Sequence, residues 1–272
     1  MPTVHVNDID IHVEEHGSGP PLLLMPPTAW PGSVWDDALV PRLRDRFHVI
    51  TYDQRGIGLS SHDDGAYTTT LLASDALGLL RAADAVPAHL FGFSTGGQIA
   101  QMMALDAPHD VRSLVLGASS ARGPGSGIPL KLALRLIEDG YDDDYWLKHL
   151  TASDFPFTRA FRERHPEKVR ALADAIDRRK PPLRTYLRHV IARGTHDARA
   201  RLGEIRVPTR VVVGSDDHEG ESGGSDHIET SRALARAIPG AELLTIDGAH
   251  HLFPWERPDE TVELLAAFYL RQ

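Results

Sequence analysis

Short apolar runs alternate with amphipathic segments along most of the chain. The apolar runs predict buried strands, and apolar residues three and four positions apart predict helices. Alternating strands and helices predict an α/β fold, with a mostly parallel central sheet covered by helices on both faces. After an N-terminal hairpin over 4–13, the predicted strands are 22–25, 47–52, 88–93, 111–117, 211–214 and 243–246. The main predicted helices between them are 33–45, 70–84, 95–105 and 231–237, and a further helix closes the chain.

The alternation stops between residues 119 and 204. This segment opens with a Gly- and Pro-rich loop and continues with helical patterns near 130–137, 169–176 and 183–191. It contains no convincing strand, and the strand–helix alternation returns after it. The sequence therefore predicts a core domain formed by 1–118 and 205–272, with 119–204 inserted as a helical cap.

The predicted strand 88–93 runs directly into a helical pattern through Gly92-Phe93-Ser94-Thr95-Gly96. Such a sharp strand-to-helix turn strains its apex residue and needs small residues on either side. The apex serine then lies beside the first N–H groups of the helix, which favour developing negative charge. Ser94 is therefore the candidate nucleophile. A second Gly-x-Ser-x-Gly match at 220–224 has no helical pattern directly behind it and is interpreted as a flexible loop.

A serine nucleophile needs a base within hydrogen-bond reach and an acid that orients that base. Asp216 and Asp217 follow the strand at 211–213, and His250 and His251 follow the last strand. The carboxyl ends of parallel strands meet at one edge of the sheet, so these side chains are expected near Ser94. The chain order is serine, aspartate, histidine.

Four motifs together resemble the α/β-hydrolase fold family over nearly the whole chain, and within it the small esterases, enol-lactone hydrolases and cofactor-free perhydrolases. The resemblance implies a Ser94–His251–Asp217 triad, with Asp217 favoured over Asp216. It also implies an oxyanion hole from the N–H groups of Thr28 and Thr95, although Pro26-Pro27 stand where many members carry His-Gly. The motifs are Gly92–Gly97, Asp53-x-Arg55-Gly56-x-Gly58-x-Ser60, Gly214–Asp217 and Gly248–His251.

Several other features have simpler interpretations. The turn from Asp53 to Ser60 is expected to brace the site without doing chemistry. His12 to His16 spells a zinc-peptidase pattern, but alternation predicts a strand, which separates the two histidines by about 13 Å. The acidic loop over 216–226 is expected to be solvated rather than metal-binding. A serine triad requires no cofactor and no metal. The candidate substrate-binding walls are Trp30, Phe93, Phe253 and Trp255.

Composition limits the partners. The chain of 272 residues has a net charge of −9 and no cysteine, which argues against nucleic acid and against disulfides. No stretch approaches the roughly 20 apolar residues of a membrane span, and the first residues carry no signal pattern. We expect a cytoplasmic protein, monomeric or homodimeric, that acts on a small molecule.

The favoured function is a serine hydrolase that cleaves an ester or lactone of a small to medium-sized metabolite. One alternative keeps the triad for C–C cleavage, cyclisation, elimination or perhydrolysis. Another is a receptor-like binding protein. The sequence leaves the substrate itself open.

Overall fold

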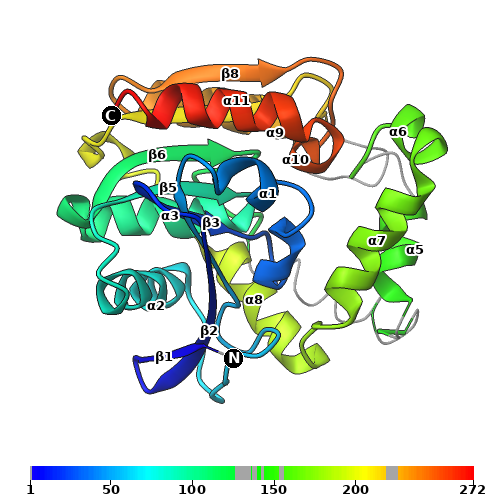
Figure 1. The fold of residues 1–272 in the computed structure, drawn as a ribbon, viewed down its shortest axis with the longest axis horizontal. Coiled ribbons are helices and arrows are strands. Elements are labelled where there is room, and N and C mark those ends of the chain that lie inside the picture. Colours follow the sequence, from blue (N-terminus) through cyan, green and yellow to red (C-terminus); the bar gives the residue numbers. More distant parts are fainter. Residues whose placement is uncertain (1, 126–135, 137–139, 142–143, 153–155, 219–225) are drawn as a thin grey trace.

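The computed structural model describes residues 2–125, 136, 140–141, 144–152, 156–218 and 226–272 (Figure 1). Its eight strands form one sheet in the order β1-β2-β4-β3-β5-β6-β7-β8. β1 and β2 pair antiparallel with each other, β2 is antiparallel to β4, and every pair from β4 to β8 is parallel. The predicted α/β fold is confirmed. The strands are β1 (Thr3–Val6), β2 (Ile9–His16), β3 (Pro21–Met25), β4 (His48–Tyr52), β5 (Ala88–Phe93), β6 (Val111–Gly117), β7 (Thr209–Gly214) and β8 (Glu242–Ile246).

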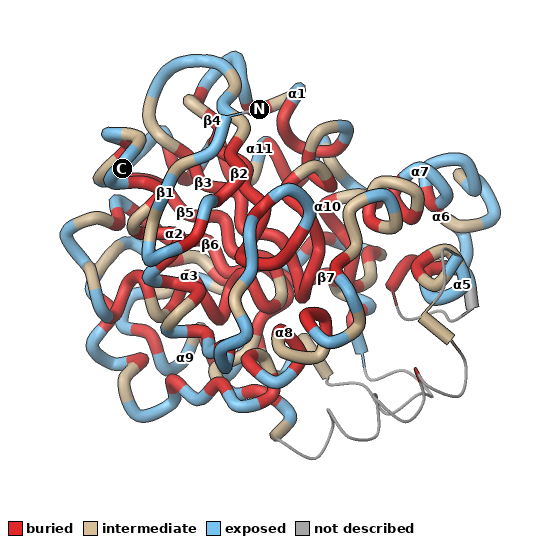
Figure 2. Tube along the Cα trace, turned by 90° about the horizontal axis from the view of Figure 1, so that it is seen from below, coloured by how far each residue is buried: buried red, intermediate tan, exposed pale blue. Residues whose placement is uncertain are grey.

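Helices cover both faces of the sheet because successive strand residues point to opposite sides. On β3, Leu22 and Leu24 pack into the core that includes α11, whereas Leu23 and Met25 pack into the core that includes α2, α3 and α9. Figure 2 shows the strands buried between these layers. The helices of the two layers are α1 (Val40–Leu43), α2 (Thr69–Ala82), α3 (Thr95–Asp106), α9 (His227–Ala237), α10 (Phe253–Glu256) and α11 (Pro258–Tyr269), with the 3-10 helices η1 (Gly32–Trp35), η2 (Pro108–Asp110) and η3 (Leu202–Glu204).

In the described part of the segment predicted to be a cap, helices α5 to α8 follow β6. In Figure 1, α5, α6 and α7 lie together at one side of the molecule, and α8 runs from there toward the sheet. The predicted helices near 169–176 and 183–191 are confirmed, whereas the pattern near 130–137 and the motif at 220–224 lie outside the described residues, apart from Leu136. The bounds are α5 (Tyr145–Ala152), α6 (Arg159–Arg164), α7 (Pro166–Asp177) and α8 (Leu183–Thr195).

The continuous helix predicted over 33–45 is wrong. The structure has the short η1, a turn, and then the four-residue α1, in which Pro41 occupies one of the first two positions. Proline has no N–H to donate to a preceding carbonyl, so a helix restarts at it more readily than it passes through it. The apolar spacing was correct, since Val34, Trp35, Leu39 and Leu43 are all buried.

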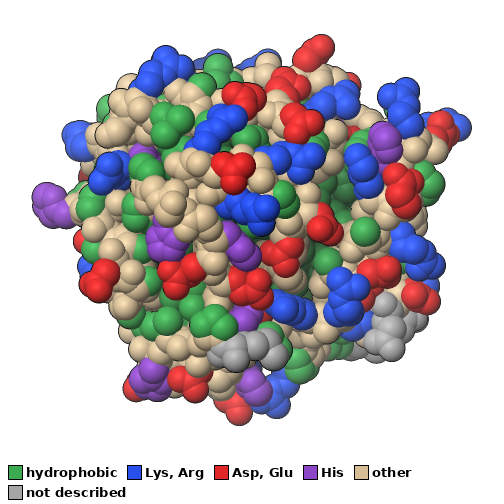
Figure 3. Space-filling view, in the orientation of Figure 1, with side chains coloured by type: hydrophobic (Ala, Val, Ile, Leu, Met, Phe, Trp, Pro, Cys, Tyr) green, Lys and Arg blue, Asp and Glu red, His purple; other side chains and the backbone are tan. Residues whose placement is uncertain are grey.

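The surface is polar and mixed in charge. On the face shown in Figure 3, basic and acidic side chains are interspersed rather than separated into patches. Across the described residues, no helix combines the length and the apolar character needed to span a bilayer.

Candidate active site

Ser94 occupies the turn between β5 and α3, and its backbone is strained. It has φ 53° and ψ −115°, outside the regions that non-glycine residues prefer. A Cβ on Gly96 would lie 2.3 Å from the carbonyl oxygen of Met25, and one on Gly92 would lie 2.5 Å from that of Gly96. Glycine is therefore required on both sides for strand and helix to approach. Ser94 is partly exposed between buried neighbours, as a nucleophile must be.

Asp217 and His251 meet at the same edge of the sheet. The Nδ1–H of His251 donates to Oδ2 of Asp217 over 3.1 Å, and both side chains are buried. Asp216 is exposed and accepts a hydrogen bond from the Ser215 hydroxyl instead. The ring of His251 packs against Phe93, the residue before Ser94, with 5.3 Å between the ring centroids. The geometry thus pairs His251 with Asp217 rather than with Asp216.

The electrostatics of this pair suit a general base. Burial alone would raise the pKa of Asp217, but His251 and His227 outweigh burial and hold that pKa well below its usual range. Burial lowers the pKa of His251, and Asp217 offsets only part of that effect. An ionised aspartate accepts the Nδ1–H, so Nε2 is the basic nitrogen of a neutral imidazole at neutral pH.

His227 is a second histidine on the same aspartate, and sequence analysis missed it. Its Nδ1–H donates to Oδ1 of Asp217 over 3.1 Å, so each carboxylate oxygen accepts one imidazole. The rings of His227 and His251 lie 4.3 Å apart at 41°. His227 is the first residue of α9, directly after the acidic loop that follows β7. That position beyond a strand end is the one feature of the sequence that could have pointed to it.

Thr28 lies in the loop after β3, and Thr95 is the first residue of α3. Their hydroxyls are 2.5 Å apart and hydrogen-bonded, and both residues are buried. No bond from either backbone N–H to another described residue is found among the loop and turn hydrogen bonds. The hydroxyl bond holds Thr28 against Thr95, the residue that follows Ser94.

Aromatic side chains from distant segments surround the turn. Trp255 stacks on Trp35 at 4.7 Å and makes edge contacts with Trp30 and Phe93. Trp30 in turn contacts Trp146 of α5 at 5.3 Å. Of the four predicted wall residues, Phe93 and Phe253 have no exposed surface and Trp30 is almost fully buried. Trp255 is partly exposed.

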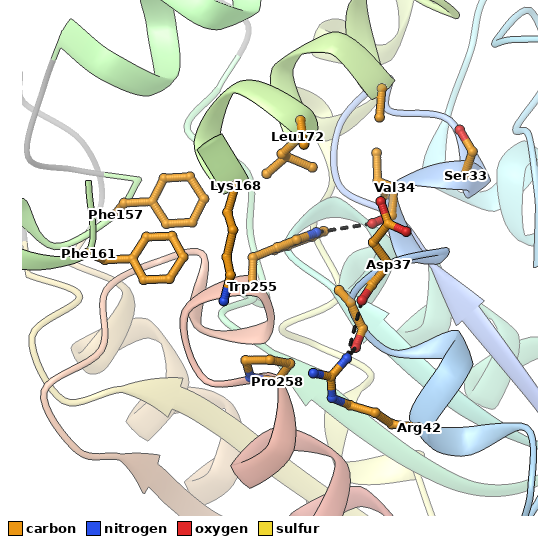
Figure 4. Close-up of a pocket in the computed structure, with 13 residues that line it drawn as sticks. Ser33, Val34, Asp37, Arg42, Phe157, Phe161, Lys168, Leu172, Trp255 and Pro258 are labelled. Carbon is orange, nitrogen blue, oxygen red and sulfur yellow. Dashed lines mark hydrogen bonds between the residues drawn. The ribbon is translucent and has the colours of Figure 1, made fainter. Parts of the chain in front are cut away.

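Trp255 is one of the residues that line a pocket of about 200 Å³ (Figure 4). Phe157, Phe161 and Leu172 form one wall, and Val34 forms part of the opposite wall. The indole N–H of Trp255 donates to the carbonyl oxygen of Val34 over 3.1 Å. Trp255 therefore lines this pocket and also contacts Phe93, the residue before Ser94.

Among the described residues, two clusters have the ligand types of a metal site, and neither contains both His12 and His16. In the first, Asp217 accepts Nδ1–H bonds from His227 and His251, so the imidazole lone pairs on Nε2 do not converge with the carboxylate. The second consists of Glu14, His16 and Asp36, with Arg179 3.7 Å from Glu14. His12, the other histidine of the zinc pattern, donates to Glu14 on the same strand.

The turn from Asp53 to Ser60 is a structural brace, as expected. Asp53 accepts from the N–H groups of Gly32 and Leu59, and the hydroxyl of Ser60 donates to the carbonyl oxygen of Asp53. Arg55 is buried and forms a bidentate pair with Asp75 at 2.6 and 2.7 Å. These bonds fix the loop after β4.

A parallel sheet in this strand order, with a strained serine turn behind β5, defines the class of the protein as an α/β-hydrolase-fold enzyme. The chain belongs to the alpha/beta hydrolase family, whose model matches residues 16–264. It is 30% identical over 271 residues to the inferred carbamate hydrolase RutD of Azorhizobium caulinodans, covering 98% of each chain.

Solved structures give the same result. The enol-lactonase of Burkholderia xenovorans LB400 superposes with a TM-score of 0.85 at 25% identity, covering 100% of both chains. A thermophilic esterase from Thermogutta terrifontis has a TM-score of 0.83 at 26% identity, covering 99% of this chain and 96% of that one. The resemblance inferred from the motifs is therefore confirmed.

Proposed function

We propose that the protein is a serine hydrolase that cleaves an ester or lactone of a small to medium-sized metabolite. The observation that carries this proposal is the buried Asp217–His251 hydrogen bond at the sheet edge where the strained Ser94 begins α3. The relatives named as an enol-lactonase and an esterase support the same reaction class.

In the proposed reaction, the Ser94 hydroxyl oxygen attacks the carbonyl carbon while Nε2 of His251 takes its proton. The N–H groups of Thr28 and Thr95 donate to the resulting oxyanion, assisted by the N-terminus of α3. His251 then gives the proton to the departing alkoxide, which leaves an acyl group on Ser94. Water, deprotonated by His251, releases the acid and restores the serine.

We assign Asp217 the task of holding the imidazole through Nδ1 and of stabilising the imidazolium that forms during both steps. We assign residues 119–204 the role of a cap over the substrate. Trp30 and Trp255 are the candidate apolar walls, since they link the serine turn to the helices of that segment.

A fluorophosphonate probe tests whether Ser94 is activated. Intact-protein mass spectrometry should find one added probe mass on the wild type and none on Ser94→Ala. In parallel, p-nitrophenyl acetate, p-nitrophenyl butyrate and a simple lactone are incubated in H₂¹⁸O, and hydrolysis should place one ¹⁸O in the acid product. A wild type that is neither labelled nor active on any of these substrates would overturn the proposal. Turnover without ¹⁸O would favour the non-hydrolytic alternative.

A further inference from the structure

The loop after β6 brings helix α8 to the catalytic edge of the sheet. β6 lies between β5, which leads to Ser94, and β7, which leads to Asp217. The hydroxyl of Ser119, in this loop, donates to the carbonyl oxygen of Ser94 over 2.8 Å. A few residues further on, the N–H of Gly123 donates to the carbonyl oxygen of His196 over 2.8 Å. The end of α8 is therefore fixed beside the serine turn.

Arg193 lies in the last turn of α8, directly at this junction. A Cβ on Gly123 would lie 1.9 Å from the carbonyl oxygen of Arg193, so the helix backbone is pressed onto the loop. Arg193 is seven residues after Tyr186, and residues at that spacing share a helix face. Tyr186 contacts Trp146, which contacts Trp30 two residues after Thr28. The face of α8 that carries Tyr186 and Arg193 therefore points toward the aromatic side chains that include Trp146 and Trp30.

The charge of Arg193 influences the pKa of His251, the predicted base. Burial lowers the pKa of His251 and raises that of Tyr186, and the positive charge of Arg193 lowers both. The guanidinium is therefore close enough to His251 and to Tyr186 for its charge to act on both side chains.

Arg193 has no counter-ion among the described residues. Its Nε is inaccessible to solvent and makes no hydrogen bond, and no ion pair of its side chain is found in the described part of the chain. The buried Arg55, by contrast, is held by Asp75 and Asp63. Leaving a partly buried cation without a partner costs stability unless a ligand supplies the missing charge.

We propose that Arg193 binds an anionic group of the substrate, which makes the preferred substrate an ester or lactone that also carries a carboxylate. A guanidinium presents parallel N–H donors that match a carboxylate in a bidentate pair. The acid group would anchor on α8 while the ester or lactone carbonyl reaches Ser94. This inference rests on the proposed hydrolase function and adds the substrate class to it.

A pair of esters of equal chain length isolates the effect of the charge. Mono-p-nitrophenyl glutarate carries a carboxylate, whereas p-nitrophenyl pentanoate ends in a methyl group. Their kcat/KM values are measured for the wild type, Arg193→Gln, Arg193→Lys and, as a control, Arg184→Gln. Arg184 is an exposed arginine on the same helix that pairs with Asp64. Rates are compared on the pH plateau of each variant, because removing Arg193 also removes one influence on the pKa of His251.

The wild type should prefer the anionic ester, and Arg193→Gln should lose about 10- to 100-fold in kcat/KM on that ester alone, as expected for a hydrogen bond to a charged group. Arg193→Lys should recover part of the loss, and Arg184→Gln should behave as the wild type. An equal loss on both esters, or a wild type that hydrolyses only the neutral ester, would overturn the inference and leave the hydrolase function standing.

Glutarate binding keeps the inference testable if neither ester is cleaved. Thermal shift should then detect glutarate binding to the wild type and not to Arg193→Gln, which would support anion recognition while the hydrolase proposal fails. If the wild type neither hydrolyses the esters nor binds glutarate, the anion-binding inference and the hydrolase proposal are both overturned.

Discussion

Two buried carboxylates, Asp75 and Asp217, differ in the groups that donate hydrogen bonds to them. Asp75 accepts from Arg55 through both oxygens, at 2.6 and 2.7 Å, and also from Asn7. Asp217 accepts one imidazole on each oxygen, from His251 and His227. The first network ends in a guanidinium that cannot lose a proton, so it can only hold the loop in place. The second ends in an imidazole whose other nitrogen can accept a proton. The comparison indicates that the terminal partner, more than burial itself, separates a network that can only hold the loop from one whose last member can accept a proton.

The largest effect is expected at Asp217, and its neighbour Asp216 provides the control. Asp217→Asn should lower kcat by about 10⁴-fold, because an amide no longer holds the imidazole in the required tautomer. Asp216→Asn should stay within about 2-fold, since Asp216 is exposed and does not contact His251. Steady-state kinetics on p-nitrophenyl butyrate check both. Equal losses in the two variants would contradict the assignment of the acid.

Breaking the structural network should cost stability rather than rate. Arg55→Met leaves Asp75 buried with its guanidinium partner removed, and the free energy of unfolding should fall by about 3–5 kcal/mol. Urea unfolding measures the loss. The kcat of the folded fraction, obtained by active-site titration, should stay within about 2-fold of the wild type. A large drop in that kcat would show that the brace also positions the site.

Acid should loosen the attachment of α8 to the core. Burial lowers the pKa of His189 and of His196 to about 4, while His189 donates to the carbonyl oxygen of Arg55. Between the unfolded-state pKa of roughly 6.5 and pH 4 the unfolded chain binds these protons and the native protein does not, so stability falls as pH decreases. The Tm should drop across this range, and less steeply in His196→Gln. A Tm that is flat from pH 7 to pH 4 would contradict the assigned protonation.

The smallest effect is expected from replacing His227. Two substitutions distinguish its hydrogen bond to Asp217 from the effect of its charge on His251. His227→Leu should lower kcat about 10-fold because Asp217 loses one of its two imidazole donors. His227→Asn, whose amide nitrogen can replace Nδ1, should restore most of the rate. Both variants should move the acid limb of the pH–rate profile upward, because His227 lowers the pKa of His251. If the acid limb of the pH–rate profile is unchanged in both variants, His227 does not influence the pKa of His251.

Much of the fold follows from the local pattern. The apolar runs predicted the parallel strands, and the apolar runs with their small-residue turn placed Ser94 at the strand–helix junction. The order serine, aspartate, histidine located the candidate site because parallel strands end at one edge. The interruption of the helix predicted over 33–45 is also a local effect, because Pro41 lacks the N–H that a continuous helix would need there.

Other features depended on contacts between segments far apart in the chain. The sequence alone could not decide between Asp216 and Asp217, which differ only in the direction that each side chain takes after β7. The local pattern did not single out His227 and Arg193, because their surroundings depend on long-range packing. His227 contacts Asp217 in the loop after β7, and the end of α8 is bonded to the loop after β6. Local periodicity determines which elements form. The order of strands in the sheet, set by long-range packing, decides which side chains meet.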